Sequence, residues 1–309
     1  MKPLWNLPPK FISTTHSLGR FLRRDVVGLT PVQIRLALDS LSRLYPGPAD
    51  VHFAYEMIQE QQVARLRLKR DQPKQGVFFV HGGGFAFGSA RTHRAIASAL
   101  TMETGCEVWI PEYPLAPEHP FPAALNSLEA MWREFKSQYD SVFVLADSAG
   151  GSLAVAMMQR LSREERHEIQ GLMLLSPWVD LRSNSMSSRA DSNAWSPFGR
   201  LDMLEYATHY LAGADPKQIE ASPLLGSFEA FPPTLIETSA MEYLHPDACA
   251  LKERLLAEEI EVCWREEENA LHGWQLFPDI LPEAKRSVAA MSQFMDEKRV
   301  AEPRHQMHG

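Results

Sequence analysis

Apolar and polar residues change their spacing along the chain, and these changes mark the predicted elements. Between residues 30 and 50 the apolar side chains recur at helical spacing, with Thr30 at the capping position and Pro31 at the first helical position. From about residue 51 the pattern alternates, in VHFAYEMI and again in QVARLRLKR, which predicts two half-exposed strands. Residues 77–80, VFFV, are wholly apolar, which is typical of a strand buried on both faces.

Beyond residue 90 the pattern predicts strands that alternate with helices. We expect helices over residues 92–103, 120–138, 246–258 and 282–298, a further helix that ends at residue 163, and strands over residues 107–113, 142–146, 169–176, 234–239 and 261–266. Strands separated by helices of this length form parallel βαβ units. The predicted fold class is therefore α/β, with a mostly parallel central sheet flanked by helices and ligands bound beyond the carboxyl ends of the strands.

One segment interrupts this alternation. Residues 180–223 are first polar and serine-rich and then helical, which indicates an insertion or lid after the sixth strand. We expect an amino-terminal helical cap segment over residues 1–50, a main domain over residues 51–298 with a cap insertion at about 181–222, and a tail over residues 299–309. The two helical segments together would form a hydrophobic roof for a substrate.

Composition and charge exclude several classes of protein. The chain has 309 residues, 45% of them hydrophobic, which is enough for a substantial core. Its net charge of −8 gives no sign of the positive surface that binds nucleic acid. Cys106, Cys249 and Cys263 lack paired spacing, which disfavours a disulfide framework or a zinc site and fits a reducing compartment. Because we find neither a signal peptide nor a stretch long enough to span a bilayer, we expect a cytoplasmic protein.

The stretch VFVLADSAGGSLAV, residues 142–155, predicts a nucleophile. An apolar run ends at Ala146, a cluster of small residues follows, and a helical pattern then begins, so Ser148 falls on a sharp strand-to-helix turn. Such a turn crowds the backbone, which explains the small residues Ala146 and Gly150 on either side. The alternative is an ordinary helix entry in which Asp147 or Ser148 is the N-cap.

A glycine-rich loop follows the strand VFFV. Residues 81–88 read HGGGFAFG, and three adjacent glycines lose conformational entropy unless the backbone takes special dihedral angles or approaches a ligand closely. We expect the amides of Gly83 and Gly84 to bind an oxyanion together with the amide of Ala149. A flexible turn and a phosphate cradle are the alternatives, but neither a GKS/T sequence nor a GxGxxG helix entry is present.

A serine nucleophile needs a base, and the base needs a carboxylate to orient it. In this sheet architecture the chain order is serine, acid, histidine, with the acid and the base on loops after later strands. His272 lies in the loop between the last strand and the last helix, which is the required place. The other late histidines fit less well, because His245 is too close to the acid loop and His305 and His308 lie in the tail.

Two carboxylates in the loop after the strand TLIETS are candidates for the acid. We favour Glu242, which comes soon after the strand, where a rigid base holds a carboxylate; Asp247 is placed to cap the helix behind Pro246 and stays the alternative. The glutamate run over residues 266–268 is nearer to His272 in sequence, but charge runs usually form a solvated face.

Large aromatic residues accompany these motifs. They are candidates for the walls of an apolar pocket for the acyl or alcohol group, although buried aromatic residues more often belong to the core. The candidates are Phe85, Phe87, Trp178 and Trp274.

Several blocks, in this order, resemble one family. HGGGFAFG, EYPLAPEHPFPAALNS, DSAGGSLA, SPWVDL, SPLLG and the loops of Glu242 and His272 are similar to blocks of the hormone-sensitive-lipase family of α/β-hydrolases, the HGGG-type carboxylesterases. The resemblance covers about residues 75–295. It implies the α/β-hydrolase fold, an amino-terminal helical cap, esterase activity on short to medium acyl esters, and an oxyanion hole that corresponds to Gly83, Gly84 and Ala149.

The chain departs from this family's pattern at three positions. Ala146 stands where glycine is usual two residues before the nucleophile, Glu242 where aspartate is usual, and Pro114 where the YRLAPEH block has arginine. The first change adds one methyl group and the second keeps a carboxylate, so hydrolysis remains the expected reaction.

The sequence therefore predicts a serine carboxylic ester hydrolase that acts through an acyl-enzyme. Ser148 would attack the ester, His272 would transfer the proton and Glu242 would orient His272. We expect no metal or organic cofactor, a small-molecule ester as substrate, no nucleic-acid partner, and a monomer or homodimer. An amide or formamide hydrolase with the same triad is the alternative, and a non-catalytic small-ligand receptor on the same fold is a further one.

Overall fold

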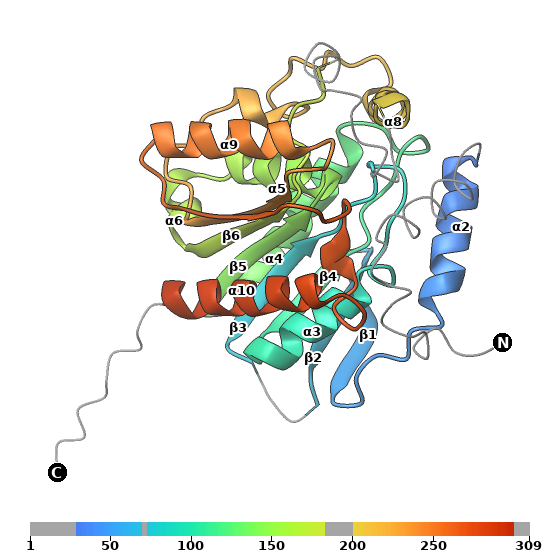
Figure 1. The fold of residues 1–309 in the computed structure, drawn as a ribbon, viewed down its shortest axis with the longest axis vertical. Helices are drawn as coiled ribbons and strands as arrows, with labels where there is room; N and C mark the ends of the chain where they lie inside the picture. Colours follow the sequence, from blue (N-terminus) through green and yellow to red (C-terminus); the bar gives the residue numbers. More distant parts are fainter. Residues whose placement is uncertain (1–28, 70–72, 183–199, 300–309) are drawn as a thin grey trace.

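The computed structural model describes residues 29–69, 73–182 and 200–299. Their centre is an eight-stranded sheet in the order β1-β2-β4-β3-β5-β6-β7-β8 (Figure 1). β2 pairs antiparallel with β1 and β4, and all other neighbours are parallel, which confirms the predicted α/β class. The strands are β1 (Val51–Ile58), β2 (Gln61–Leu68), β3 (Gln75–Val80), β4 (Glu107–Pro111), β5 (Ser141–Asp147), β6 (Ile169–Leu175), β7 (Thr234–Ser239) and β8 (Val262–Glu267).

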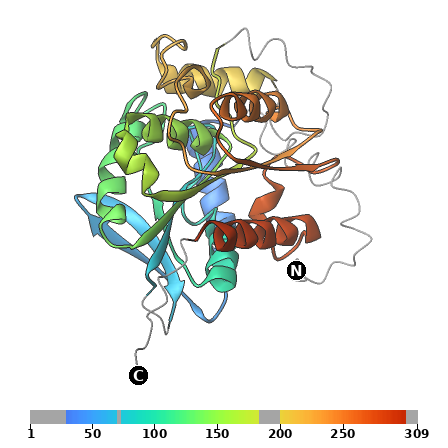
Figure 2. The same cartoon turned by 90° about the vertical axis from the view of Figure 1, so that its left-hand side faces the viewer.

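Helices cover both faces of the sheet (Figures 1 and 2). α4, α5 and α9 pack on one face, and α3 and α10 pack on the other. Within the described ranges, no helix combines the length and the apolar character needed to cross a membrane. The helices are α2 (Pro31–Ser42), α3 (Arg94–Thr104), α4 (Ala123–Lys136), α5 (Ala149–Arg160), α6 (Arg163–His167), α8 (Arg200–Leu211), α9 (His245–Ala257) and α10 (Pro282–Lys298), with short 3-10 helices η3 (Pro223–Leu225) and η4 (Trp274–Leu276).

β3 shows how the sequence produces this two-sided core. Its side chains from Val77 to Val80 are all fully buried. Because side chains alternate across a strand, Phe78 and Val80 pack with α4 and α5, whereas Val77 and Phe79 pack with α3 and α10. A wholly apolar strand is what a sheet covered on both faces requires.

The helix boundaries follow local capping signals. Thr30 caps α2 as predicted, and its hydroxyl accepts a hydrogen bond from the amide of Gln33. The helix predicted to end at residue 163 ends already at Arg160, which corrects that boundary, and a separate short helix, α6, begins at Arg163. The break occurs because Leu161 takes an extended backbone and Ser162 begins α6 with a capping box to Glu165.

The predicted cap and insertion fall partly outside the described residues. Residues 1–28 of the expected cap segment, residues 183–199 of the expected insertion and residues 300–309 of the tail lie there. The described parts of these segments include α2 and α8, and both helices contact the loop at residues 81–88. Arg35 of α2 donates a hydrogen bond to the carbonyl oxygen of Ala86, and Tyr210 of α8 stacks on Phe85.

A buried ion pair joins the start of α3 to the end of β5. The Nε2 atom of His93 lies 3.2 Å from Oδ1 of Asp147, and both side chains are buried. The same carboxylate oxygen accepts a hydrogen bond of 2.8 Å from the amide of Gly82. The other ring nitrogen of His93, Nδ1, lies 3.1 Å from the carbonyl oxygen of Ser89 and 2.8 Å from the hydroxyl oxygen of Thr92, which donates its own proton to Ser89. Because both ring nitrogens face acceptors, the site suits an imidazolium that donates from each.

Each partner of this pair shifts the pKa of the other. Burial alone would lower the pKa of His93, but the charge and hydrogen bond of Asp147 outweigh burial and raise it. Burial would likewise raise the pKa of Asp147, but the charge and hydrogen bond of His93 and the amide of Gly82 lower it. The charged pair therefore ties the loop after β3 to the turn after β5.

We expect Phe78→Ala to lower the free energy of unfolding by about 3–5 kcal/mol, because it removes a fully buried ring and leaves a cavity. The ring lies 5.5 Å from that of Trp132 and 5.3 Å from that of Phe135, between centroids. Urea unfolding measures the loss. The control is Met57→Ala at an exposed position of β1, for which we expect a change within about 0.5 kcal/mol. Equal losses in the two variants would contradict this account of the core.

We expect the stability that His93 contributes to depend on pH. Because its folded-state pKa is raised above the unfolded value of about 6.5, the contribution is fully present below that value and is lost as the pH rises through the folded pKa. The difference in free energy of unfolding between the native protein and His93→Gln, measured by urea unfolding, should therefore shrink from about pH 6 to about pH 9. The exposed His119→Gln is the control, and identical profiles for both variants would argue against the ion pair.

Candidate active site

Ser148 lies on the sharp turn between β5 and α5. Its backbone has φ 49° and ψ −125°, a conformation that L-residues rarely adopt, and strained residues of this kind cluster at functional sites. Ser148 occupies the N-cap position of α5, but its hydroxyl makes no capping bond, and the carboxylate of Asp147 accepts from the amide of Gly82 instead. The geometry therefore favours the nucleophile turn over the ordinary helix entry.

Three loops bring Ser148, His272 and Glu242 together. The Ser148 turn follows β5, the Glu242 turn follows β7, and the His272 loop follows β8. The Oγ atom of Ser148 lies 2.9 Å from Nε2 of His272, and Nδ1 of His272 lies 2.7 Å from Oε2 of Glu242. A proton on Nδ1 donates to the carboxylate, which leaves Nε2 as the acceptor that faces the serine hydroxyl.

Glu242 is buried and remains ionised. The hydroxyl of Thr238 and the amide of Ser239 both donate to its Oε1 atom. Burial alone would raise the pKa of Glu242, but the hydrogen bond and charge of His272, with those two donors, lower it. An ionised carboxylate in this position can orient an imidazole and can stabilise an imidazolium.

Asp247, the alternative acid, has a different position and role. It lies within the first turn of α9, whose N-cap is Leu244, so the prediction that it caps this helix is wrong. Its Oδ2 atom instead accepts hydrogen bonds from the amides of Val179 and Asp180, at 2.9 Å and 3.2 Å. Asp247 therefore fixes the loop after β6, and the structure brings Glu242 to His272.

The loop at residues 81–88 takes a backbone that requires glycine. Gly83, Gly84 and Phe85 have φ of 122°, 58° and 62° in succession. A Cβ atom on Gly83 would lie only 2.1 Å from the carbonyl oxygen of Phe87, so a larger residue does not fit. The carbonyl oxygen of Gly83 accepts a hydrogen bond of 2.9 Å from the amide of Phe87, which closes the loop into a defined turn.

Three backbone amides beside Ser148 are available to a ligand. These free amides are those of Gly83, Gly84 and Ala149. None of them has a hydrogen-bond partner among the residues that the structure describes. The first turn of α5 lies against the end of β3 and the start of the glycine loop, since a Cβ atom on Gly150 would lie 2.2 Å from the carbonyl oxygen of Val80 and 2.6 Å from that of His81. Free amides beside a nucleophile and at a helix N-terminus stabilise negative charge that develops on a carbonyl oxygen.

Several supporting residues were not predicted from the sequence. His81 is fully buried, its ring stacks on that of Tyr113 at 4.3 Å between centroids, and the hydroxyl of Tyr113 donates to the His81 carbonyl oxygen. Burial and the nearby charge of His93 lower the pKa of His81 to about 3, so its ring is neutral. The sequence did contain a signal for three of these residues. His81, His93 and Asp147 are polar residues that stand among apolar ones in or near the two motifs.

The four aromatic candidates are all buried. Phe85 stacks on Tyr210 of α8 at 3.9 Å between centroids and lies 5.4 Å from Trp178. Phe87 lies edge-on to Tyr206, also of α8, at 5.4 Å. Trp274 belongs to a separate small cluster with Ala270, Leu281 and Ala284.

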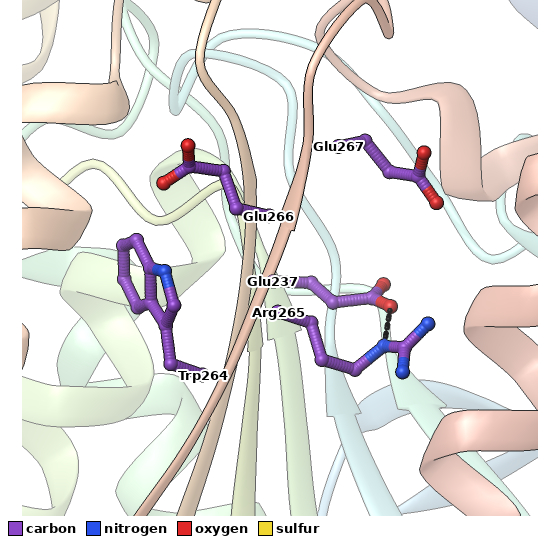
Figure 3. Close-up of a pocket in the computed structure, with 5 residues that line it drawn as sticks. All are labelled: Glu237, Trp264, Arg265, Glu266 and Glu267. Carbon is purple, nitrogen blue, oxygen red and sulfur yellow. Dashed lines mark hydrogen bonds and ion pairs between the residues drawn. The ribbon is translucent and has the colours of Figure 1, made fainter.

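A hollow of about 190 Å³ lies elsewhere, at β7 and β8 (Figure 3). Trp264 and Glu266 point to one side of β8, and Arg265 and Glu267 to the other. The guanidinium of Arg265 lies 3.0 Å from the carboxylate of Glu237. Ser148 is not among the lining residues, so this hollow is separate from the candidate active site.

Comparison with known sequences identifies relatives over most of the chain. The model of a family with the α/β-hydrolase fold matches residues 77–276. An esterase of Acinetobacter venetianus is 29% identical over 272 residues, which cover 87% of this chain and 89% of the relative. An acetyl-hydrolase of Streptomyces hygroscopicus is 33% identical over 227 residues, which cover 72% of this chain and 76% of the relative.

Solved structures resemble this one over nearly its whole length. An esterase from the bacterial hormone-sensitive-lipase family has a TM-score of 0.83 at 27% identity, covering 92% of this chain and 97% of that one. The protein EstE5, whose crystal was soaked with p-nitrophenyl butyrate, has a TM-score of 0.83 at 25% identity, covering 94% and 99%. The chain therefore belongs to the α/β-hydrolase fold family and, within it, to the hormone-sensitive-lipase family of esterases.

Proposed function

We propose that this protein is a serine carboxylesterase that hydrolyses short to medium acyl esters through an acyl-enzyme. The observation that carries the proposal is the position of His272, whose ring nitrogens lie 2.9 Å from the hydroxyl of Ser148 and 2.7 Å from the carboxylate of Glu242. The similarity to an esterase and to an acetyl-hydrolase supports an ester as the bond that is cleaved.

In the acylation half, the Oγ atom of Ser148 attacks the carbonyl carbon while Nε2 of His272 takes the hydroxyl proton. The ionised Glu242 stabilises the imidazolium. The carbonyl oxygen becomes an oxyanion that accepts hydrogen bonds from the free amides, and the loss of one such donor typically costs about 3 kcal/mol of transition-state stabilisation. The intermediate then collapses: the bond to the alcohol breaks, His272 protonates the alcohol, and the acyl group stays on Ser148.

In the deacylation half, water replaces the alcohol. His272 takes a proton from the water, the resulting hydroxide attacks the acyl carbon, and the free amides again stabilise the oxyanion. Collapse of this second intermediate releases the carboxylic acid and returns the proton to Ser148. Every proton moves between His272 and an oxygen atom, so the three side chains and the free amides account for the reaction.

For the apolar pocket we propose Phe85, Phe87 and Trp178, which lie in the glycine loop and in the loop after β6, and Trp274 on the His272 side. The contacts of α8 with Phe85 and Phe87 support a roof over this region that is built from the insertion and the amino-terminal segment. We also propose a cytoplasmic location, which the three free cysteines fit, and a monomer or homodimer.

We expect Ser148→Ala to lower kcat for p-nitrophenyl acetate by at least about a thousandfold, because the attacking atom is removed. Initial rates at saturating substrate measure the loss, and circular dichroism verifies that the variant folds. The control is Ser137→Ala, at an exposed position that follows α4, which should keep its activity. If Ser148→Ala keeps a tenth of the native rate, the nucleophile is not Ser148.

We expect Glu242→Gln to lower kcat by roughly a hundredfold or more, because a neutral amide neither orients the imidazole correctly nor stabilises the imidazolium. Asp247→Asn should cost far less, since Asp247 holds the loop after β6 through backbone amides that an Asn oxygen also accepts. Gln and Asn have nearly the same shape as Glu and Asp, so the comparison isolates the effect of the negative charge. The reverse ranking of the two losses would assign the acid role to Asp247.

A further inference from the structure

Arg35 of α2 reaches two loops at once. Its Nε atom donates to the carbonyl oxygen of Ala86 at 2.6 Å, and its Nη2 atom donates to the carbonyl oxygen of Ala116 at 2.5 Å. The carboxylate of Glu118 binds the same guanidinium from outside, at 2.9 Å and 2.7 Å. The planar guanidinium presents several donors in fixed directions, which allows it to bind all these acceptors together.

Together with two further hydrogen bonds, these contacts hold the glycine loop at both ends. The amide of Ala116 donates to the carbonyl oxygen of Phe85 at 2.9 Å, next to the Ala86 carbonyl that Arg35 binds. At the other end of the loop, the amide of Gly82 is held by the carboxylate of Asp147. The two attachments, at residues 82 and 86, therefore bracket the amides of residues 83 and 84.

The loop needs such attachments because its backbone is strained. Three successive residues, from Gly83 to Phe85, have positive φ, and Phe85 is not a glycine. A conformation of this kind persists only where surrounding contacts determine it. A shift of the loop would move the donors from the place where the oxyanion forms, and their benefit depends on that place.

The rest of α2 contributes little to the packing of the fold. Ile34 is its one buried residue and Leu38 packs, partly buried, against the same core, whereas Val32, Leu36 and Leu41 are exposed. The Arg35 side chain is 26% exposed, and the bonds that it makes run to the site rather than into the core. Its removal should therefore act on the glycine loop more than on the stability of the whole domain.

We propose that Arg35 is a positioning residue that fixes the glycine loop through the carbonyl oxygens of Ala86 and Ala116, and so couples α2 to the donors of the oxyanion hole. The proposal rests on the proposed function, since it concerns the donors of that site. Arg35 acts through the loop backbone and does not touch the reacting atoms.

The test compares Arg35→Met and Arg35→Lys with Arg43→Met, a matched control on the solvent side of the same helix region, where Arg43 pairs with Asp39. For Arg35→Met we expect kcat for p-nitrophenyl acetate to fall about tenfold or more with KM nearly unchanged, because the donors act mainly in the transition state. Arg35→Lys should recover part of the lost kcat, since the lysine ammonium keeps the positive charge but lacks the several fixed N–H donors of the guanidinium. Arg43→Met should match the native protein.

Hydrogen exchange gives a second measure that does not need turnover. In Arg35→Met we expect faster exchange at the amides of Phe87 and Ala116, which close the loop, and native exchange in β5 and α10. Native kcat and native exchange in Arg35→Met, or equal losses in Arg43→Met, would overturn the proposal. Loss of protection throughout the chain would also overturn it, because Arg35 would then support the whole fold. If the native protein lacks Ser148-dependent turnover, the proposed function fails, and the exchange result still decides whether Arg35 holds the loop.

Discussion

The close approach of β3 and the start of α5 is the contact on which the rest of the site depends. A Cβ atom on Gly150 would lie 2.2 Å from the carbonyl oxygen of Val80, so the helix comes this near only because glycine is there. The approach sets the amide of Ala149 beside the glycine loop that begins at His81. It also accompanies the left-handed backbone of Ser148, so the strained turn and the neighbouring free amides belong to one packing arrangement.

Two buried carboxylates, Asp147 next to Ser148 and Glu242 behind His272, each pair with a histidine but suit different ends. Asp147 pairs with His93 and Glu242 pairs with His272, and in both cases the histidine keeps the carboxylate ionised despite burial. The difference lies in what the second ring nitrogen faces. In His93 it faces the carbonyl oxygen of Ser89 and the hydroxyl of Thr92, which donates its own proton to that same carbonyl oxygen, whereas in His272 it faces the hydroxyl of Ser148, which can give up its proton. The Asp147–His93 pair therefore suits a fixed structural contact, and the Glu242–His272 pair suits proton transfer.

Much of the fold was predictable because it depends on local patterns. Apolar spacing identified the strands and most helices, and the order of motifs along a parallel sheet indicated that the loops of Ser148, Glu242 and His272 meet at one edge. Contacts between distant residues were not predictable in this way. Asp247 was expected to cap its own helix, yet its partners Val179 and Asp180 lie 68 and 67 residues away in sequence. Such pairings depend on how loops pack across the sheet, which no local pattern contains.

The attachments of the glycine loop explain how a strained segment can serve as a precise donor site. Asp147 holds the loop at residue 82 from the interior, and Arg35 holds it at residue 86 from the side of α2. Both bonds involve a charged group, and such hydrogen bonds are stronger than neutral ones. In the proposed mechanism, fixing both ends orients the amides of Gly83 and Gly84 before a substrate arrives, so little reorganisation is left for the moment of reaction. One of these attachments comes from α2, so any movement of that helix relative to the sheet would also change the geometry of the donors.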